Sequence, residues 1–321
     1  MQFDFIHAGL GKCMSTTLQN IWSGSSNTHY KSGAPIAQVA NRLVQEHRSN
    51  LSRMPLFNIT PEEGPQKASV LSSEIFAFSF VNEPHNAALI GPKQAYIAQG
   101  LKALSSTVLF VVRDPFAWIR SCHGQSIHQG GYENAAQFLR VQRAVVIENM
   151  NLSRLFAAWR QYGFRIVVLP MEMYIQTPDQ FWSVYEAQLD VPIPDNQTEI
   201  SGRKRNQSHR ETLPIAAAIN RLQHTLWGLV ERGDGPDKVA VGDALDVVRR
   251  WGTRRALEEA RADEILDLRQ RVSHQAEQEF HDFSLDDDLL NTLREHYVQP
   301  LRGFAPMTDW VDQYMASLVR R

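Results

Sequence analysis

Four short apolar runs, each followed by a polar or proline-marked turn, constrain the fold of this chain more than any other feature. They are rich in Val, Ile, Leu and Phe and occupy residues 3–8, 69–72, 108–112 and 166–169. Runs this continuous are typical of parallel strands that are covered on both faces. Because helical patterns lie between them, the sequence predicts an α/β fold in which helices flank a doubly wound parallel sheet.

The helical patterns extend beyond the last apolar run and divide the chain into two parts. Within the first part they cover residues 15–22, 35–47, 86–104, 115–128 and 135–162. From Glu211 onward the pattern is only helical, over residues 211–232, 243–260, 263–280 and 286–297. We therefore expect an α/β core over residues 1–210. A helical extension over residues 211–321 would complete that domain or form a lid.

Composition and charge exclude several classes of protein. The chain has 321 residues, 43% apolar and 21% charged, with a net charge of −2, so no global basic field predicts binding to nucleic acid or to an acidic membrane. Cys13 and Cys122 are the two cysteines, too few for a disulfide framework. The N-terminal residues lack the pattern of a signal peptide, and no apolar run is long enough to span a bilayer. We expect a cytoplasmic protein.

A glycine-containing loop joins the first apolar run to the first helical pattern. Gly9 and Gly11 allow a tight turn, and Lys12 adds a positive charge. The hydroxyl and N–H groups of residues 15–17 would lie at a helix N-terminus, which favours anions. The loop is predicted to bind phosphate, or else to be an ordinary strand–helix turn capped by serine. It does not match the triphosphate loop G-x-x-x-x-G-K-[ST], because Ile6 and Cys13 occupy two of its required positions.

A second motif follows the third apolar run. Arg113, Asp114 and Pro115 form the turn, and Ser121 comes eight residues after Arg113 on the next helical pattern. An Arg at the carboxyl end of a strand and a Ser on the following helix can approach one phosphate from two directions. The alternative is a solvent-facing Arg paired with Asp114, together with a serine that bonds to its own helix.

Together the two motifs resemble the sulfotransferase family that uses 3′-phosphoadenosine 5′-phosphosulfate (PAPS), whose fold is similar to that of P-loop nucleotide-binding proteins. The family's loop has the form K-[ST]-G-[TS]-[TS]-x-L, and its later strand ends in R-[DN]-P with a Ser eight residues after the Arg. Residues 165–181 and Asn206-Gln207-Ser208 extend the likeness in the right order, over roughly residues 3–210. Met14 departs from the pattern, since the family has a glycine there. This position therefore adopts either a left-handed or a helical backbone.

The resemblance implies a role for each matched residue. Lys12 would stabilise charge on the leaving group, and Arg113 with Ser121 would hold the 3′-phosphate. Arg205 and Ser208, in a late basic loop, would contact the same phosphate. The residues that would line the phosphosulfate are Gly11, Lys12, Cys13, Met14, Ser15, Thr16 and Thr17.

The catalytic base is predicted from the second apolar run. Glu74 follows this run at the edge where ligands bind in parallel sheets and is the first candidate, although such a carboxylate can also simply stabilise a helix N-terminus. His85 is the second candidate. No metal is expected, since the sequence has no convincing set of metal ligands.

The expected enzyme is therefore a PAPS-dependent sulfotransferase acting on a hydroxyl or amine of a small-molecule or carbohydrate acceptor. A P-loop kinase or nucleotide triphosphatase and a non-catalytic nucleotide-binding relative are the alternatives. The sequence does not identify the acceptor. It also leaves open whether the protein forms a homo-oligomer.

Overall fold

A computed structural model describes residues 2–46, 67–78, 84–198, 213–214, 216–221, 224, 280 and 282–319. The chain forms two compact units. The first unit comprises Met1–Ile119, Ala144–Asn206 and Leu285–Arg321, and the second comprises Arg120–Arg143 and Gln207–Ser284. The domain boundary expected near residue 210 lies outside the described residues.

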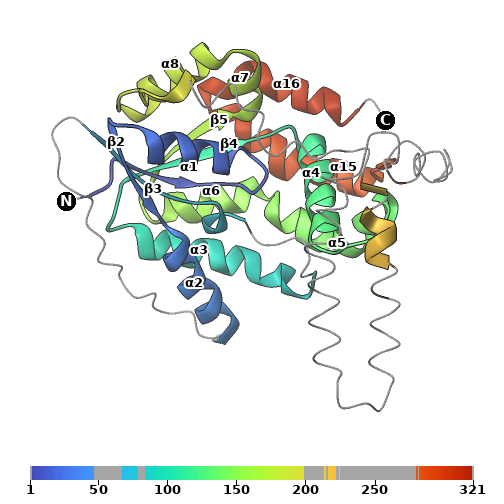
Figure 1. Cartoon of the computed structure of the whole chain (residues 1–321). Helices are drawn as coiled ribbons and strands as arrows, with labels where there is room; N and C mark the ends of the chain where they lie inside the picture. Colours follow the sequence, from blue (N-terminus) through green and yellow to red (C-terminus); the bar gives the residue numbers. More distant parts are fainter. Residues whose placement is uncertain are drawn as a thin grey trace. The chain divides into compact units, whose positions relative to one another are not determined.

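A five-stranded parallel sheet in the order β2-β3-β1-β4-β5 forms the centre of the first unit (Figure 1). Its strands are β1 (Phe5–Ala8), β2 (Thr28–Ser32), β3 (Ala68–Ser73), β4 (Thr107–Val112) and β5 (Arg165–Pro170). The predicted α/β fold class with a parallel sheet flanked by helices is confirmed. The strand order makes β3 and β4 the two neighbours of β1, so the turns that follow these three strands lie side by side at one edge.

The four strands predicted from apolar runs are all present, and β2 is the one that the sequence analysis missed. Its sequence is Thr-His-Tyr-Lys-Ser, and only Thr28 is buried. As an edge strand with a single neighbour, β2 is partly solvent-exposed and does not need a continuous apolar run. A search for apolar runs therefore cannot find it.

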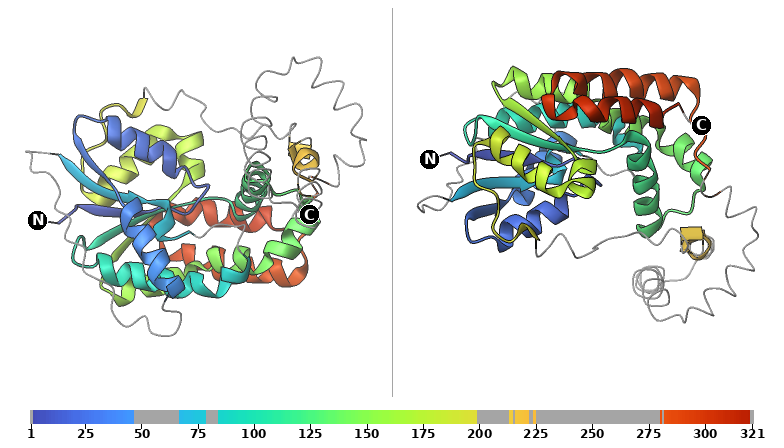
Figure 2. Two further views of the ribbon diagram at one scale, coloured as in Figure 1. Left: turned by 60° about the horizontal axis from the view of Figure 1, so that its bottom comes forward. Right: turned by 90° about the horizontal axis from the view of Figure 1, so that it is seen from above.

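Helices cover both faces of the sheet, as Figures 1 and 2 show. The helices that lie wholly in the first unit before the C-terminal segment are α1 (Ser15–Gly24), α2 (Ala34–Glu46), α3 (Ile90–Leu101), α6 (Leu152–Gln161), α7 (Met171–Gln176) and α8 (Pro178–Leu189). Two more helices, α4 (Pro115–His128) and α5 (Ala135–Asn149), belong partly to the first unit and partly to the second. Two short 3₁₀ helices, η1 (Glu74–Phe76) and η2 (Pro84–Leu89), lie between β3 and α3.

Aromatic contacts identify the helices on each face. Phe5 on β1 packs edge-on against Trp22 of α1 and Tyr185 of α8, with ring centroids 5.8 and 5.9 Å away. On the other face, Phe110 of β4 packs against Phe156 and Trp159 of α6 at 5.4 and 5.7 Å. Because these rings are buried, each face contributes to a substantial hydrophobic core.

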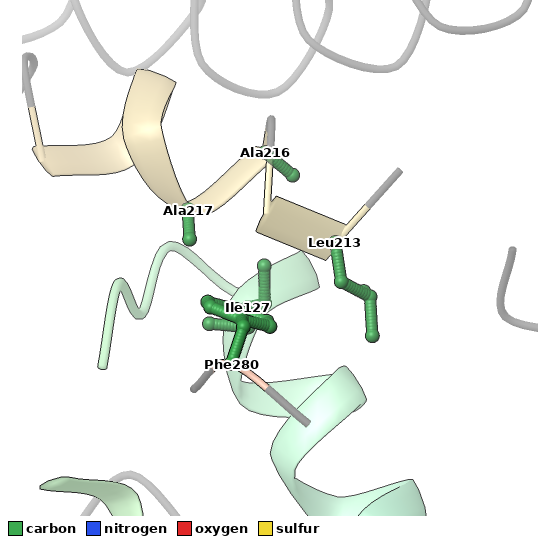
Figure 3. Close-up of a cluster of buried hydrophobic side chains, with 5 residues drawn as sticks. All are labelled: Ile127, Leu213, Ala216, Ala217 and Phe280. Atoms are coloured by element: carbon green, nitrogen blue, oxygen red, sulfur yellow. The ribbon is translucent and has the colours of Figure 1, made fainter. Parts of the chain in front are cut away.

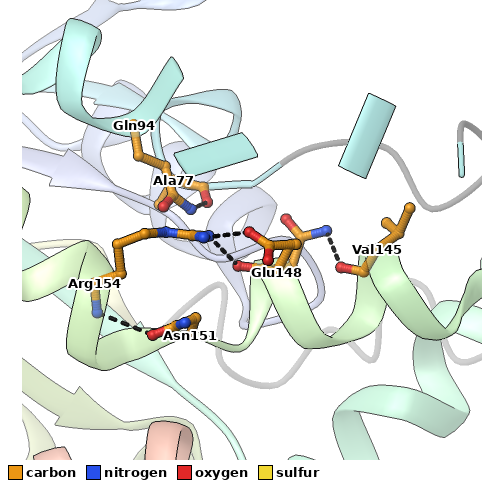
Figure 4. A network of polar contacts seen from close by, with 7 residues as sticks. Ala77, Gln94, Val145, Glu148, Asn151 and Arg154 are labelled. Atoms are coloured by element: carbon orange, nitrogen blue, oxygen red, sulfur yellow. Dashed lines mark hydrogen bonds and ion pairs between the residues drawn. The ribbon is translucent and has the colours of Figure 1, made fainter. Parts of the chain in front are cut away.

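The helical stretch predicted over residues 135–162 is two helices, because Asn151 begins a new one. Its side-chain oxygen accepts the N–H of Arg154 at 3.0 Å, which caps α6. Arg154 also forms an ion pair with Glu148 of α5 and donates to the Glu148 carbonyl at 3.0 Å (Figure 4). A side chain at Gly91 of α3 would overlap the Arg154 guanidinium, so this glycine allows α3 and α6 to pack closely.

The C-terminal segment returns to the first unit. It consists of α15 (Asp287–Leu293), the π turn η5 (Arg294–Val298), the 3₁₀ turns η6 (Gln299–Gly303) and η7 (Ala305–Met307), and α16 (Thr308–Ser317). The helix predicted over residues 286–297 thus changes to a π turn after Leu293. Phe304 packs against Phe156 of α6 at 5.2 Å, which anchors the segment beside the core.

The second unit has a small apolar core. Ile127, Leu213, Ala216, Ala217 and Phe280 form a buried cluster, shown in Figure 3. Asn220 donates to the carbonyl oxygens of Ile127 and Gly131 at 2.8 and 2.7 Å.

Much of the predicted helical part lies outside the described residues. The described residues among 213–224 are helical, in agreement with the prediction over 211–232. The helix predicted over 243–260 is not described, and of the helix predicted over 263–280 only Phe280 is. None of the helices formed by the described residues combines the length and apolarity needed to cross a membrane.

Candidate functional site

Three of the predicted site residues follow neighbouring strands at one edge of the sheet. Lys12 follows β1, Glu74 follows β3 and Arg113 follows β4. The register pairs Ala8 with Ser73, so β1 and β3 end at the same level. The strand order therefore assembles three charged side chains that are far apart in the sequence.

The loop between β1 and α1 has an unusual backbone. Lys12 and Met14 have φ values of 67° and 55°, both in the left-handed region. Of the two alternatives for Met14, the left-handed backbone is the one present, even though the residue is not glycine. Each such residue costs about 1–2 kcal/mol relative to the right-handed conformation. Alternation of left- and right-handed residues turns successive N–H groups toward one side and creates an anion-binding nest.

The first turn of α1 carries backbone N–H groups without acceptors. The Met14 carbonyl accepts the N–H of Leu18 at 3.0 Å, so Met14, rather than a serine, is the N-cap of α1, and its side chain makes no capping bond. No acceptor among the described residues takes the N–H groups of Ser15, Thr16 or Thr17. Three orphan donors at the positive end of a helix dipole can bind an anion such as a phosphate or sulfate group.

Aromatic residues that sequence reasoning did not assign to the site hold the loop in place. The indole N–H of Trp118 donates to the Gly11 carbonyl at 2.8 Å. The ring of Phe78 lies where a Gly11 side chain would be, since an added Cβ would lie 2.6 Å from a ring carbon. Phe78 and Trp118 also contact each other edge-on, with centroids 6.1 Å apart. Gly11 is therefore required for close packing, which the Gly-x-Gly pattern alone did not reveal.

The other predicted loop residue, Cys13, faces the protein interior. Its side chain is fully buried, and its N–H donates to the Leu10 carbonyl at 3.1 Å. The hydroxyl of Ser15 is also buried and lies 3.5 Å from the same carbonyl oxygen. Thr16 and Thr17, by contrast, are accessible to solvent at the start of α1.

Glu74 lies directly beside this loop. The N–H of Gly9 donates to the Ser73 carbonyl at 3.1 Å, and a side chain at Gly9 would come within 3.0 Å of the Glu74 Cα. Burial raises the pKa of the Glu74 carboxyl, and the positive charge of Lys12 partly offsets that rise. A carboxylate with a raised pKa is a stronger base, as a general base requires.

Two buried side chains of α3 hold the segment that follows Glu74. The Lys93 ammonium donates to the Phe78 carbonyl at 2.9 Å, and the Gln94 amide donates to the Ala77 carbonyl at 2.7 Å. The bond from Gln94 is visible in Figure 4. These bonds fix both the turn that begins with Glu74 and the Phe78 ring against Gly11.

Arg113 reaches back to the phosphate loop. Its guanidinium Nη1 donates to the Lys12 carbonyl oxygen at 3.3 Å. Asp114 does not form the ion pair with Arg113 that the alternative interpretation required. Its Oδ1 instead accepts the Ala117 N–H at 2.7 Å and caps α4. The two motifs that the sequence indicated separately thus meet at one place.

Beneath the loop, a neutral histidine connects β1 with β3. Burial lowers the pKa of His7 to about 3, so its imidazole is uncharged at neutral pH. Its Nδ1 lies 2.8 Å from the Ser72 hydroxyl oxygen, which also accepts from the Gln19 amide at 3.1 Å. His7 therefore supports the loop without adding positive charge to the site.

For the remaining predicted residues, a place at this site stays a prediction. Ser121 belongs to the second unit, so its pairing with Arg113 stays a prediction. The backbone of His85 lies in η2, but its side chain is outside the described part of the chain. Arg205 and Ser208 also lie outside the described residues. The described ranges contain no group of three or more His, Cys, Asp or Glu side chains placed to hold a metal ion.

In comparisons with known proteins, no family model matches the chain, and no curated protein or solved structure matches it either.

Proposed function

We propose that this protein is a sulfotransferase that moves the sulfuryl group of PAPS to a hydroxyl or amine of a small-molecule or carbohydrate acceptor. The proposal depends mainly on the contact between the Arg113 guanidinium and the main chain of Lys12. Two motifs that we assign to anion binding, and whose order and spacing resemble those of the sulfotransferase family, lie at the same edge of one parallel sheet. A nucleotide with phosphates at both its 5′ and 3′ positions needs two such motifs close together.

The residues of the loop fit the phosphosulfate end of such a nucleotide. The N–H groups of Ser15, Thr16 and Thr17 offer donors to a 5′-phosphate, and the left-handed residues beside them shape a concave backbone. Lys12 adds a full positive charge that stabilises the oxygen on which negative charge develops as sulfuryl transfer proceeds. Preorganised donors of this kind are the main contribution that a protein makes to such a transfer.

The other end of the nucleotide is assigned to Arg113. Its planar guanidinium can donate two parallel hydrogen bonds to a 3′-phosphate, which selects PAPS over nucleotides that lack this group. Ser121, Arg205 and Ser208 are proposed to complete the 3′-phosphate contacts.

Glu74 is proposed as the general base, with His85 as the alternative. As the acceptor oxygen forms a bond to sulfur, the bond between sulfur and the 5′-phosphate oxygen breaks, and the acceptor proton passes to the Glu74 carboxylate. The raised pKa of Glu74 favours this proton transfer, because a base works best when its pKa approaches the working pH.

Nucleotide binding tests the proposal without knowledge of the acceptor. Adenosine 3′,5′-bisphosphate at 100 times its Kd should stabilise the protein by about 2.7 kcal/mol, which is a rise in unfolding temperature of about 4 °C. ATP with magnesium should give no comparable rise. Stabilisation by ATP with magnesium alone would indicate a kinase or nucleotide triphosphatase, and stabilisation by neither nucleotide would reject both enzymes.

Catalysis is tested with Lys12→Ala once an acceptor has been found by screening with labelled PAPS. The variant should lose transfer by on the order of 100-fold or more while binding adenosine 3′,5′-bisphosphate only moderately less tightly. Lys102→Ala is the matched control, because Lys102 is an exposed lysine at the C-terminal end of α3. Equal turnover of the Lys12→Ala variant and the wild type would exclude the proposed role.

A further inference from the structure

The backbone at Arg113 is held by a tyrosine from the other end of the chain. The Arg113 N–H donates to the Tyr297 hydroxyl oxygen at 3.1 Å, and the Tyr297 hydroxyl donates to the Arg113 carbonyl oxygen at 2.6 Å. One hydroxyl group thus satisfies both polar groups of a residue that lies just beyond β4. Tyr297 is buried in the π turn η5 and is only 2% exposed, so no water layer competes for these bonds.

The next residue is held in a similar way. The Asp114 N–H donates to Oε1 of Glu172 at 2.9 Å, and Oε2 of Glu172 accepts the hydroxyl of Tyr314 from α16. Tyr314 is also buried. Three consecutive polar groups of the turn after β4 are therefore bonded to side chains and not to a neighbouring strand: the Arg113 N–H, the Arg113 C=O and the Asp114 N–H. These side chains come from α7 and from the C-terminal segment.

The hydroxyl groups of Tyr297 and Tyr314 act as hydrogen-bond donors in this network because both are protonated. Burial raises the pKa of both tyrosine hydroxyls well above the ordinary value, and the neighbouring Glu172 raises them further. Both hydroxyls consequently stay protonated and remain donors at neutral pH. The Tyr297 hydroxyl donates its proton to the Arg113 carbonyl oxygen. The lone pairs of the hydroxyl oxygen can then accept the Arg113 N–H.

The direction of the Arg113 side chain depends on this support. The guanidinium is anchored at one end by the Lys12 carbonyl, and the backbone from which it projects is anchored by Tyr297. A hydrogen bond to phosphate weakens steeply when its donor leaves the preferred distance and angle. Any change that frees the backbone at Arg113 should therefore weaken the binding of a phosphate to the Arg113 guanidinium.

We propose that Tyr297, together with the Glu172–Tyr314 pair, positions Arg113 and so determines how strongly the protein prefers a nucleotide that carries a 3′-phosphate. The inference rests on the proposed function, which assigns that phosphate to Arg113. Both tyrosines are buried, so this proposal gives them no contact with the nucleotide. They act through the backbone of residues 113 and 114.

The experiment compares the affinities of adenosine 3′,5′-bisphosphate and adenosine 5′-monophosphate by calorimetry, because their ratio isolates the contribution of the 3′-phosphate. Arg113→Ala should lower this ratio by on the order of 10- to 100-fold. Tyr297→Phe removes one hydroxyl, keeps the ring, and should lower the ratio about 5-fold, a smaller loss because the guanidinium remains present. In the Arg113→Ala background, Tyr297→Phe should lower the ratio no further, since it acts through Arg113.

Two further variants complete the test. Tyr185→Phe is the matched control, because it removes a hydroxyl from a buried tyrosine of the same unit that packs on Phe5 and Trp182. It should leave the ratio unchanged. Tyr314→Phe, which acts through Glu172, should lower the ratio less than Tyr297→Phe does, and it provides the same readout if Tyr297→Phe does not fold.

The outcomes separate the two proposals. If Arg113→Ala leaves the ratio unchanged, the assignment of Arg113 in the proposed function is wrong, and the positioning role fails with it. If Arg113→Ala lowers the ratio but Tyr297→Phe and Tyr314→Phe do not, only the positioning role is wrong. If Tyr297→Phe weakens both nucleotides equally, the tyrosine has a structural role alone, which also overturns the inference.

Discussion

Because the backbone at Met14 is left-handed, we predict that glycine at this position gives a more stable protein than alanine, the reverse of the order within a helix. Met14→Gly and Met14→Ala both remove the half-buried methionine side chain, so their difference reports the backbone alone. With φ at 55°, alanine bears a cost of about 1–2 kcal/mol that glycine avoids. Glycine also has more conformational freedom than alanine in the unfolded chain, and this lowers the stability of the glycine variant by about 0.4–1 kcal/mol. The Met14→Gly variant should therefore be more stable than Met14→Ala by about 1 kcal/mol.

Urea unfolding measures this difference. A gap of 1 kcal/mol with a slope of about 3 kcal/mol per molar urea separates the two midpoints by about 0.3 M. Ser183, exposed in the middle of α8, provides the control, because there Ser183→Ala should be more stable than Ser183→Gly by about 1 kcal/mol. If alanine is also the more stable residue at position 14, then Met14 is not left-handed, and the anion-binding shape assigned to the loop is wrong.

Two further predictions concern the surroundings of the loop. Gly11→Ala should lower the free energy of unfolding by about 1–3 kcal/mol, because the new methyl group would overlap the Phe78 ring. Phe78→Leu should recover part of this loss in a double-mutant cycle, and strict additivity of the two changes would contradict the overlap. Burial raises the pKa of Glu74, so the native state keeps its proton at pH values where the unfolded chain has lost it. Stability should therefore fall as the pH rises from the ordinary glutamate pKa through the raised one. Glu74→Gln should flatten this part of the profile, whereas an unchanged slope would show that the carboxyl is not buried.

Local sequence patterns determined most of the sheet and part of the site. Continuous apolar runs predicted four of the five strands, because a strand buried on both faces must be apolar along its whole length. The glycine- and lysine-containing loop and the turn at Arg113 were also recognisable, because each consists of consecutive residues with a distinct conformational or chemical role. The edge strand β2 had no such pattern, since most of its residues are not fully buried.

Strand order and long-range hydrogen bonds were decided by the tertiary structure. The sequence placed Glu74 after a strand, but only the position of β3 beside β1 brings its carboxyl next to Lys12. Tyr297 reaches Arg113 across 184 positions of the chain, and no periodicity or motif signals such a contact. Hydrophobic periodicity and backbone propensity are local properties, whereas these contacts depend on how separate elements pack against one another. The left-handed Met14 has the same origin, because surrounding packing imposes a conformation that the residue does not favour by itself.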